Sequence, residues 1–316
     1  MSRYSDASLA TALLTSHAIK RPDPPLSVTR FWDVVRTVED PGKLLGLESA
    51  AIAQTLGCTL DDARQVEALL STATALAFEL EGFERSGIRL VTAFDDDYPA
   101  HLIERLGAHA PPLLHVAGSS ELLGIEGVGV VGSRNVGTEA REIADQVAHA
   151  AVRHRLPAIS GVARGIDQVA MAGALDAEGR VVGIPADAMD RLLRDASIRR
   201  AILNEQLCLA TPYSPRAGFS VGTAMARNKL IYALARVTVV VTSDRGKGGT
   251  WTGALESIEK GYGPVAVWMG EGAGDGNSEL VAHGGLPIHD IEEIFSIARA
   301  RDIAPASREQ QLRLGL

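Results

Sequence analysis

The sequence predicts an α/β protein with a doubly wound, mostly parallel sheet, preceded by a small all-helical domain. Composition is the first sign: hydrophobic residues make up 46% of the 316 residues but aromatic residues only 4%, which is typical of small side chains packed closely between helices and a parallel sheet. The second sign is that apolar runs alternate with helical segments after residue 125, as in βαβ units. The third is the helical spacing of residues 28–87, which glycines interrupt.

The chain divides into four parts by pattern. Residues 1–27 are weakly patterned and predict a loose N-terminal arm. Residues 28–87 predict the helical domain, and residues 88–300 predict the core that contains the sheet. Residues 301–316 are polar and predict a frayed tail.

The strands expected in the core follow its apolar runs. Residues 90–92 predict a short strand, 100–106 a helix, and 113–116 a second strand. A longer series of apolar runs occupies residues 128–131, 156–160, 180–184, 206–210, 237–241 and 264–268. Helical segments separate most of these runs, so we expect parallel strands with helices on both faces.

Cysteine content and hydropathy bear on the location of the protein. Cys58 and Cys208 lie far apart in the sequence, whereas disulfide and zinc frameworks need more cysteines. No apolar run reaches the roughly 18 residues of a membrane span, and the N-terminus lacks the pattern of a signal peptide. We therefore expect a soluble cytoplasmic protein with no metal site and no membrane association.

Charge is distributed unevenly along the chain. The net charge is −8, which by itself argues against nucleic-acid binding. Residues 127–236, however, hold 14 Lys and Arg against 10 Asp and Glu, a net charge of +4. Because anion binding depends on the local field, the middle of the chain is the candidate region, although charge alone does not distinguish this from ordinary scatter.

Turns at the carboxyl ends of strands are where a doubly wound sheet binds ligands. In the turn after 128–131, Gly132 and Ser133 leave the backbone amides open to an anion, and Arg134 adds a fork of donors that suits phosphate. This turn lacks the G-x-G-x-x-G spacing of dinucleotide-binding proteins. An ordinary βα turn with a surface arginine is the alternative.

The turn after 156–160 reads "SGVARGID". Gly161 and Gly165 bracket a narrow loop, in which Arg164 is a candidate phosphate ligand. Asp167 follows, and we interpret it as a structural cap of the next helix that orients Arg164. A catalytic role is less favoured, because no second acid or histidine lies at useful local spacing.

Two later segments add donors at the same edge of the sheet. The Arg-Asn-Lys run at 227–229 fans around a helix, so that only one or two of its side chains face a ligand; a solvated helix face is the alternative. Gly249, Thr250 and Thr252 open another helix, where small residues and hydroxyls suit an anion or a nucleotide. Together the turns predict a groove suited to phosphates.

The motifs occur in the order "GVVGSR", "SGVARGID", "ARNKLIYAL", "GGTWTGALESIEKGYGPVAV" and "GNSELVAHGGLPI". This order resembles the DNA-processing protein family DprA, also called Smf, over roughly residues 88–290. The second and third motifs together are specific to that family, whereas "VGSR" alone is not.

The resemblance implies an extended Rossmann-like fold that binds single-stranded DNA, protects it and helps to load a RecA-type recombinase in natural transformation. It also implies a homodimer, a helical domain similar to a sterile-alpha-motif or helix-hairpin-helix unit, and neither a cofactor nor catalysis. The DNA contacts that it implies lie at Gly132, Ser133, Arg134, Gly161, Arg164, Gly165, Asn228, Lys229, Gly249, Thr250 and Thr252.

Departures from the family pattern bear on this function. Lys229 stands where the family usually has Arg, so a bidentate fork becomes a point charge. The segment "IPADAMDRLL" lacks the family's Tyr-Pro. In place of the winged-helix domain that many members carry, we expect only the frayed tail of residues 301–316. Phe219, Tyr232 and Trp251 are the aromatic candidates for base stacking, but each is expected in the core instead, so we expect little sequence specificity. These departures also fit a divergent member in a mobile element or an antiphage system.

The main alternative is a nucleotide-ligand sensor or a phosphoribohydrolase-like enzyme of the wider Rossmann-like superfamily. Such hydrolases carry a "GG-GT--E" turn with a catalytic glutamate. Here Gly253 stands three residues after Thr250, and Glu256 comes three residues later. General acid–base catalysis needs hydrogen-bond reach, so the displaced carboxylate favours binding over hydrolysis, although a sensor needs no glutamate. A scaffold with an unused groove is the third hypothesis.

Overall fold

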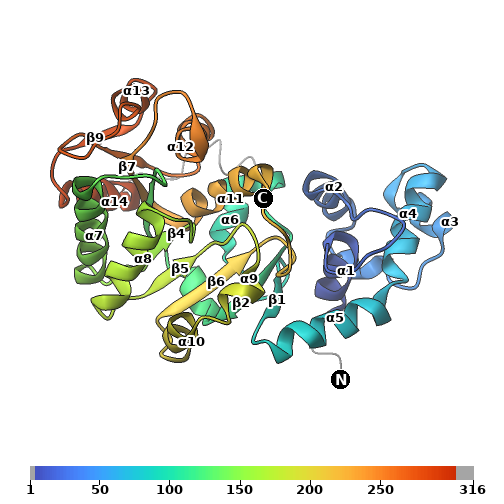
Figure 1. Ribbon diagram of the computed structural model, residues 1–316. Coiled ribbons are helices and arrows are strands. Elements are labelled where there is room, and N and C mark those ends of the chain that lie inside the picture. The colour runs from blue at the N-terminus through green and yellow to red at the C-terminus, as the bar shows by residue number, and fades with distance from the viewer. Residues whose placement is uncertain (1–3, 304–316) are drawn as a thin grey trace.

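A computed structural model describes residues 4–303, with a helical unit beside an α/β core (Figure 1). The elements of the helical unit are α1 (Asp6–Thr15), α2 (Val28–Val38), the 3-10 turn η1 (Pro41–Leu44), α3 (Ser49–Leu56), α4 (Leu60–Leu70) and α5 (Ala73–Arg85). Hydroxyl side chains cap α2 and α4: Ser27 accepts a hydrogen bond from the amide of Arg30, and Thr59 accepts one from the amide of Asp62.

Helix α1 corrects the expectation of a loose arm over residues 1–27. Ser5 caps it by accepting a hydrogen bond from the amide of Ser8, and Ala10, Leu13 and Leu14 are fully buried. The sequence pattern was weak because the helix carries small or apolar residues on nearly every side. It therefore has no polar face that would show the helical period. The first three residues and the tail from 304 lie outside the described part of the chain.

The described part of the core contains one nine-stranded sheet in the order β1-β2-β6-β5-β4-β3-β7-β8-β9. Its strands are β1 (Arg89–Thr92), β2 (Leu113–Gly118), β3 (Gly127–Gly132), β4 (Ala158–Ser160), β5 (Val181–Gly183), β6 (Leu207–Thr211), β7 (Ala235–Thr242), β8 (Val265–Trp268) and β9 (Leu286–Ile288). All pairs from β6 to β9 are parallel, and β1 and β2 add an antiparallel edge. The prediction of a mostly parallel, doubly wound sheet is confirmed.

The chain reverses its direction across the sheet at β3. From β3 it moves outward through β4 and β5 to β6, and then returns to place β7 on the other side of β3. At such a switch point the turns after neighbouring strands lead to opposite faces of the sheet, which opens a crevice at their carboxyl ends. The turns after β3, β4 and β7 are therefore the ones placed around this crevice.

Helices cover both faces of the sheet. Those of the core are α6 (Ala100–Leu106), α7 (Thr138–Arg153), α8 (Ile166–Asp176), α9 (Met189–Leu192), α10 (Ala196–Leu203), α11 (Val221–Leu234), α12 (Gly248–Lys260), α13 (Asn277–Ala282) and α14 (Glu293–Ile303), with 3-10 turns η2 (Gly107–His109) and η3 (Ser120–Gly124). Alternate strand residues divide between the faces: Val130 packs in the cluster that holds α7 and α8, and Val131 packs in the cluster that holds α6, α11 and α12.

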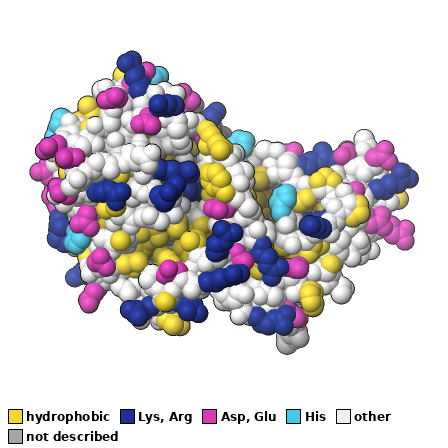
Figure 2. Space-filling view, viewed as in Figure 1, with side chains coloured by type: hydrophobic (Ala, Val, Ile, Leu, Met, Phe, Trp, Pro, Cys, Tyr) yellow, Lys and Arg dark blue, Asp and Glu magenta, His cyan; other side chains and the backbone are white. Residues whose placement is uncertain are grey.

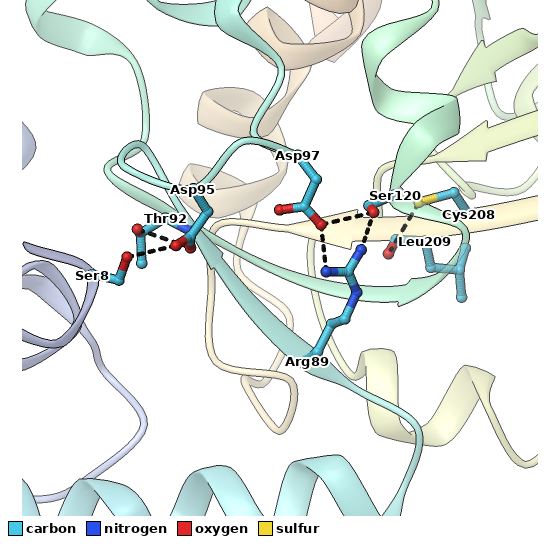
Figure 3. A network of polar contacts seen from close by, with 8 residues as sticks. All are labelled: Ser8, Arg89, Thr92, Asp95, Asp97, Ser120, Cys208 and Leu209. Carbon is cyan, nitrogen blue, oxygen red and sulfur yellow. Dashed lines mark hydrogen bonds and ion pairs between the residues drawn. The ribbon is translucent and has the colours of Figure 1, made fainter. Parts of the chain in front are cut away.

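Polar contacts join the helical unit to the core beside β1. Ser8 of α1 donates a hydrogen bond of 2.5 Å to a carboxylate oxygen of Asp95, whose other oxygen accepts from the backbone amide of Thr92 at 2.7 Å (Figure 3). Farther along the same edge, Arg89 forms an ion pair with Asp97 (Figure 3). The indole nitrogen of Trp32 adds a hydrogen bond of 2.8 Å to the carbonyl of Ala110. These bonds attach α1 and α2 to the sheet edge.

Two absences hold for residues 4–303. No helix among them combines the length and the apolar character needed to cross a membrane. In the same residues, no group of three or more His, Cys, Asp or Glu side chains is arranged to hold a metal ion.

Candidate nucleic-acid interface

A cavity of about 530 Å³ lies at the carboxyl ends of β3, β4 and β7, and we name it the central cavity. Its lining includes Gly132, Ser133, Arg134, Asp167, Phe219, Val221, Met225, Arg227, Asn228, Tyr232, Asp244, Lys247, Gly249 and Thr250. A second hollow adjoins it, and we name it the side depression; its lining includes Arg134, Gly161, Arg164, Asp187, Arg191, Phe219 and Arg227. The face shown in Figure 2 has Lys and Arg side chains interspersed with apolar atoms.

The turns after β3 and β4 are locked together at Gly165. This residue has φ of +88°, and a Cβ there would lie 2.5 Å from the carbonyl oxygen of Ser133 and 2.7 Å from the Cα of Arg134. Only glycine allows so close an approach of two backbones in this conformation. The contact holds Arg134 and Arg164 beside one another, a role of Gly165 that the sequence analysis did not foresee.

Gly161 makes room for a buried arginine. A Cβ at Gly161 would lie 1.6 Å from Nη1 of Arg227 and 2.5 Å from Oδ2 of Asp167. The guanidinium of Arg227 therefore lies directly against the turn after β4, next to the carboxylate. Arg227 is only 4% exposed, and its Nε and Nη1 have no hydrogen-bond partner among the described residues. A buried cation with unused donors is costly, so the floor of the central cavity is suited to an anionic or hydrogen-bond-accepting ligand.

Asp167 supports the turn rather than capping α8 in the expected way. Gly165 occupies the N-cap position without a side-chain bond, and Asp167 lies within the first turn of the helix. Its carboxylate accepts a hydrogen bond of 3.3 Å from the backbone amide of Ala163. Burial raises the pKa of Asp167 to about 6, although the charge of Arg227 opposes the rise. The acid thus faces Arg227, and not Arg164 as the sequence suggested.

Most of the residues predicted to contact DNA meet at this edge. The central cavity is lined by Gly132, Ser133, Arg134, Asn228, Gly249 and Thr250, and the side depression by Gly161 and Arg164. Gly165 lines a further hollow next to these two. The amide of Asn228 also donates a hydrogen bond of 2.9 Å to the carbonyl of Gly249, which ties α11 to the start of α12.

Two predicted contact residues lie apart from the cavity. Lys229 is not among the lining residues of either hollow; burial lowers its pKa, and the charge of Glu256 opposes that shift. Thr252 is exposed on α12 and is likewise absent from the lining of both. Of the Arg-Asn-Lys run, therefore, the first two side chains face the cavity.

Sequence reasoning missed Arg227 as a site residue and misplaced Phe219. Phe219 was expected in the core but is 54% exposed, and the Arg134 guanidinium lies over its ring at 5.5 Å from the centroid. Tyr232 and Trp251 are buried as expected. The sequence held no signal that singles out Arg227, because Ile231, Tyr232 and Ala233 follow Arg227, Asn228 and Lys229 by the same four residues.

The loop that carries Phe219 also touches the helical unit. In this loop, residues 212–220 between β6 and α11, Arg216 forms an ion pair of 2.9 Å with Glu79 of α5, and its guanidinium lies 4.9 Å from the ring centroid of Phe83. On its other side, the carbonyl of Ala217 accepts a hydrogen bond of 2.9 Å from the amide of Ala188. The rim of the cavity is thus held between two parts of the molecule.

The glutamate of the hydrolase alternative does not reach the cavity. Glu256 accepts a hydrogen bond of 3.0 Å from the hydroxyl of Tyr262 and is absent from the lining of the central cavity. The carboxylates that do line the cavity are Asp167, which supports the turn, and Asp244.

Comparison with known proteins gives a consistent family. The family model for DNA recombination-mediator protein A matches residues 89–299. A relative from Mycobacterium tuberculosis, named as a DNA processing protein, is 29% identical over 237 residues, which cover 69% of this chain and 59% of that protein. The DNA processing protein DprA of Streptococcus pneumoniae is 29% identical over 206 residues, or 64% of this chain and 71% of that protein. The chain thus spans about three fifths of the length of the first of these relatives.

Two solved structures share the fold. The X-ray structure of DprA from Streptococcus pneumoniae superimposes with a TM-score of 0.72 and 21% identity, covering 93% of this chain and 98% of that one. DprA from Helicobacter pylori, whose structure was described for its single-stranded DNA binding mode, gives a TM-score of 0.56 and 20% identity over 69% of this chain and 98% of that one. Because the family model matches well over half of the sequence, from β1 into α14, this chain belongs to the DNA recombination-mediator protein A family.

Proposed function

We propose that this protein binds single-stranded DNA in the central cavity and the side depression, and that it acts as a recombination mediator. The observation that carries the proposal is Arg227, a buried guanidinium with unused donors at the floor of a cavity bordered by Ser133, Arg134 and the start of α12. Phosphate oxygens supply the acceptors that such a set of donors lacks. Membership of the recombination-mediator family and the likeness to a fold that binds single-stranded DNA in Helicobacter pylori support it.

The rim of the cavity suits a single strand more than a duplex. Phe219, Val221 and Met225 are partly exposed apolar side chains that line the central cavity. An exposed ring beside cations gives an unpaired base a surface on which to stack, and this kind of contact tolerates any base. We infer that binding is largely independent of sequence.

The geometry favours binding without chemistry. Asp167 is engaged with Ala163 and Arg227, and Glu256 lies outside the cavity. A nucleotide is the second candidate ligand, because a cavity of about 530 Å³ falls within the range typical of small-molecule sites. Competition separates the two: a mononucleotide that displaces an oligonucleotide only at far higher concentration supports the DNA-binding function.

The remaining expectations of the family resemblance are part of the same proposal. We infer that a RecA-type recombinase receives the strand, that the protein is a cytoplasmic homodimer, and that it serves natural transformation or DNA processing. Analytical sedimentation of the purified chain tests whether it is a dimer. Recombinase filament formation on DNA coated with this protein tests whether the strand is transferred to the recombinase.

Replacing both exposed arginines of the interlocked turns is expected to weaken DNA binding by about tenfold and to reduce the salt slope by about two. The variant is Arg134→Ala/Arg164→Ala, and the measurement is fluorescence anisotropy of a labelled oligo-dT at two salt concentrations. Arg155→Ala/Arg180→Ala is the matched control, because these arginines are exposed and lie just before β4 and β5, at the opposite edge of the sheet. An equal loss of affinity in both variants would mean that the effect comes from net charge alone. A native protein that binds no oligo-dT at low salt would refute the proposal.

The affinity for oligo-dT is expected to rise about fivefold as the pH falls from about 7.5 to about 5.5. Over this range Asp167, whose pKa burial raises to about 6, becomes neutral and no longer compensates the charge of Arg227. Asp167→Asn is expected to bind at pH 7.5 as tightly as the native protein does at pH 5.5, and to lose most of the pH dependence. An unchanged pH dependence in this variant would assign the effect to other groups.

A further inference from the structure

A third hollow lies beside the central cavity and the side depression, where the first turns of α7 and α8 meet. This α7–α8 depression has a volume of about 260 Å³, and Arg134, Arg141, Arg164 and Gln168 line it. Arg141 is exposed on α7 and Gln168 is exposed on α8. No sequence motif pointed to either residue, because Arg141 lies seven residues after the end of "GSR" and Gln168 comes just after "SGVARGID".

The charge of this hollow is uncompensated. Three of its lining residues are arginines and none is an acid, whereas Asp167 and Asp244 line the central cavity and Asp187 lines the side depression. Glu139 and Glu142 flank Arg141 in the sequence but do not line the hollow.

Two of the three arginine side chains in the hollow also lack partners. Among the residues that the structure describes, the guanidinium groups of Arg141 and Arg164 form no ion pair and no hydrogen bond, in contrast to that of Arg153 at the far end of α7, which is paired with Glu292. Three guanidinium groups without a counter-ion repel one another in the free protein, and a bound phosphate relieves that repulsion.

The hollow is continuous with the proposed DNA site. Arg134 lines all three hollows, and Arg164 lines both the side depression and the α7–α8 depression. Both arginines stand on the turns that Gly165 locks together, so their backbone positions are fixed relative to one another. A strand that leaves the central cavity past Arg134 therefore meets Arg141 next.

We propose that the α7–α8 depression is a separate phosphate subsite, at which Arg141, with Arg164 and Gln168, holds the backbone of the strand after it has left the central cavity. This inference rests on the proposed function. It assigns one exit path to the strand, across the first turns of α7 and α8. Arg141 then contributes to the affinity only when the oligonucleotide is long enough to span both the central cavity and the α7–α8 depression.

Oligonucleotide length tests the subsite. Labelled oligo-dT of about 4 and about 16 nucleotides is titrated against the native protein, Arg141→Ala and the control Arg180→Ala. We expect Arg141→Ala to weaken the longer oligonucleotide about fivefold and to lower its salt slope by about one, with the shorter one unaffected. The melting temperature of unliganded Arg141→Ala is expected to be equal to or above that of the native protein, since the substitution removes a repulsive charge.

The outcomes separate this subsite from the function on which it rests. If the native protein binds both oligonucleotides and Arg141→Ala matches Arg180→Ala on each, the subsite is refuted and DNA binding stands. Equal weakening of the short and the long oligonucleotide also overturns it, because Arg141 then belongs to the central site. A native protein that binds neither oligonucleotide refutes both proposals.

Discussion

Arg227→Met is expected to weaken oligonucleotide binding by about 100-fold, at the upper end of what a charge-assisted hydrogen bond contributes. The physical reason is that the guanidinium is 4% exposed and two of its nitrogens have no partner in the described structure, so a phosphate or base acceptor satisfies donors that water does not reach. Methionine keeps most of the volume and adds no charge. The unliganded variant is also expected to lose thermal stability, because the buried carboxylate of Asp167 loses the positive charge that faces it.

Arg105 is the matched control for Arg227. Its side chain is equally buried, but it donates hydrogen bonds to the carbonyls of Ala233 and Ala235 and forms an ion pair with Glu126. Arg105→Met is therefore expected to destabilise the fold by about 3 kcal/mol and to leave the affinity of the folded protein intact. Anisotropy titration and thermal unfolding of both variants check this contrast. A destabilised Arg227→Met that still binds DNA normally would make Arg227 a structural partner of Asp167.

Gly165→Ala is expected to lower the free energy of unfolding by about 3 kcal/mol more than Gly107→Ala, and to weaken DNA binding about tenfold through displacement of the 133–134 turn. The two glycines share an unusual backbone conformation, with φ and ψ of 88° and −130° at Gly165 and 52° and −127° at Gly107. They differ in surroundings, since a Cβ at Gly107 has nothing within 4 Å. At Gly165 the nearest atoms belong to the backbone of Ser133 and Arg134, which cannot rotate aside.

Urea unfolding of the two variants measures the difference, because the strain of the backbone conformation is common to both. Equal destabilisation by Gly107→Ala and Gly165→Ala would mean that the contact with the 133–134 turn contributes nothing. Loss of stability in Gly165→Ala with native affinity for DNA would show that the turn does not position Arg134 for binding.

The sheet could be predicted from sequence because buried parallel strands read as continuous apolar runs. The run 128–131 became β3, and 237–241 became the longer β7, with ends that differ by one or two residues. The opposite case is α1, which is also apolar but has no contrasting face, so its period is hidden. Pattern analysis detects the contrast between faces and fails where contrast is absent.

The part of the site that depends on backbone geometry, the glycine turns, could be predicted from the sequence. The part that depends on the rotation of α11 about its axis could not. The glycines of "SGVARGID" indicated a close approach, and the structure supplies the neighbours, Ser133 and Arg227. Which residue of 227–229 faces inward depends on how α11 rests on the sheet. The sequence does not decide between Arg227 and Lys229, because an apolar residue lies one turn after each of them. The exposure of Phe219 depends on the path of a loop, for which the sequence has no periodic signal.

The loop of residues 212–220 has a consequence for how the affinity for DNA is determined. It carries Phe219 at the rim of the cavity, yet Arg216 within it is bonded to Glu79 of the helical unit. The width of the proposed DNA-binding surface therefore depends in part on a unit that does not line either hollow. We expect relatives with the same glycine turns and the same arginines to differ in affinity where their N-terminal helices differ. Exchanging the helical unit between relatives is therefore expected to change the affinity of the proposed site without changing any residue that lines it.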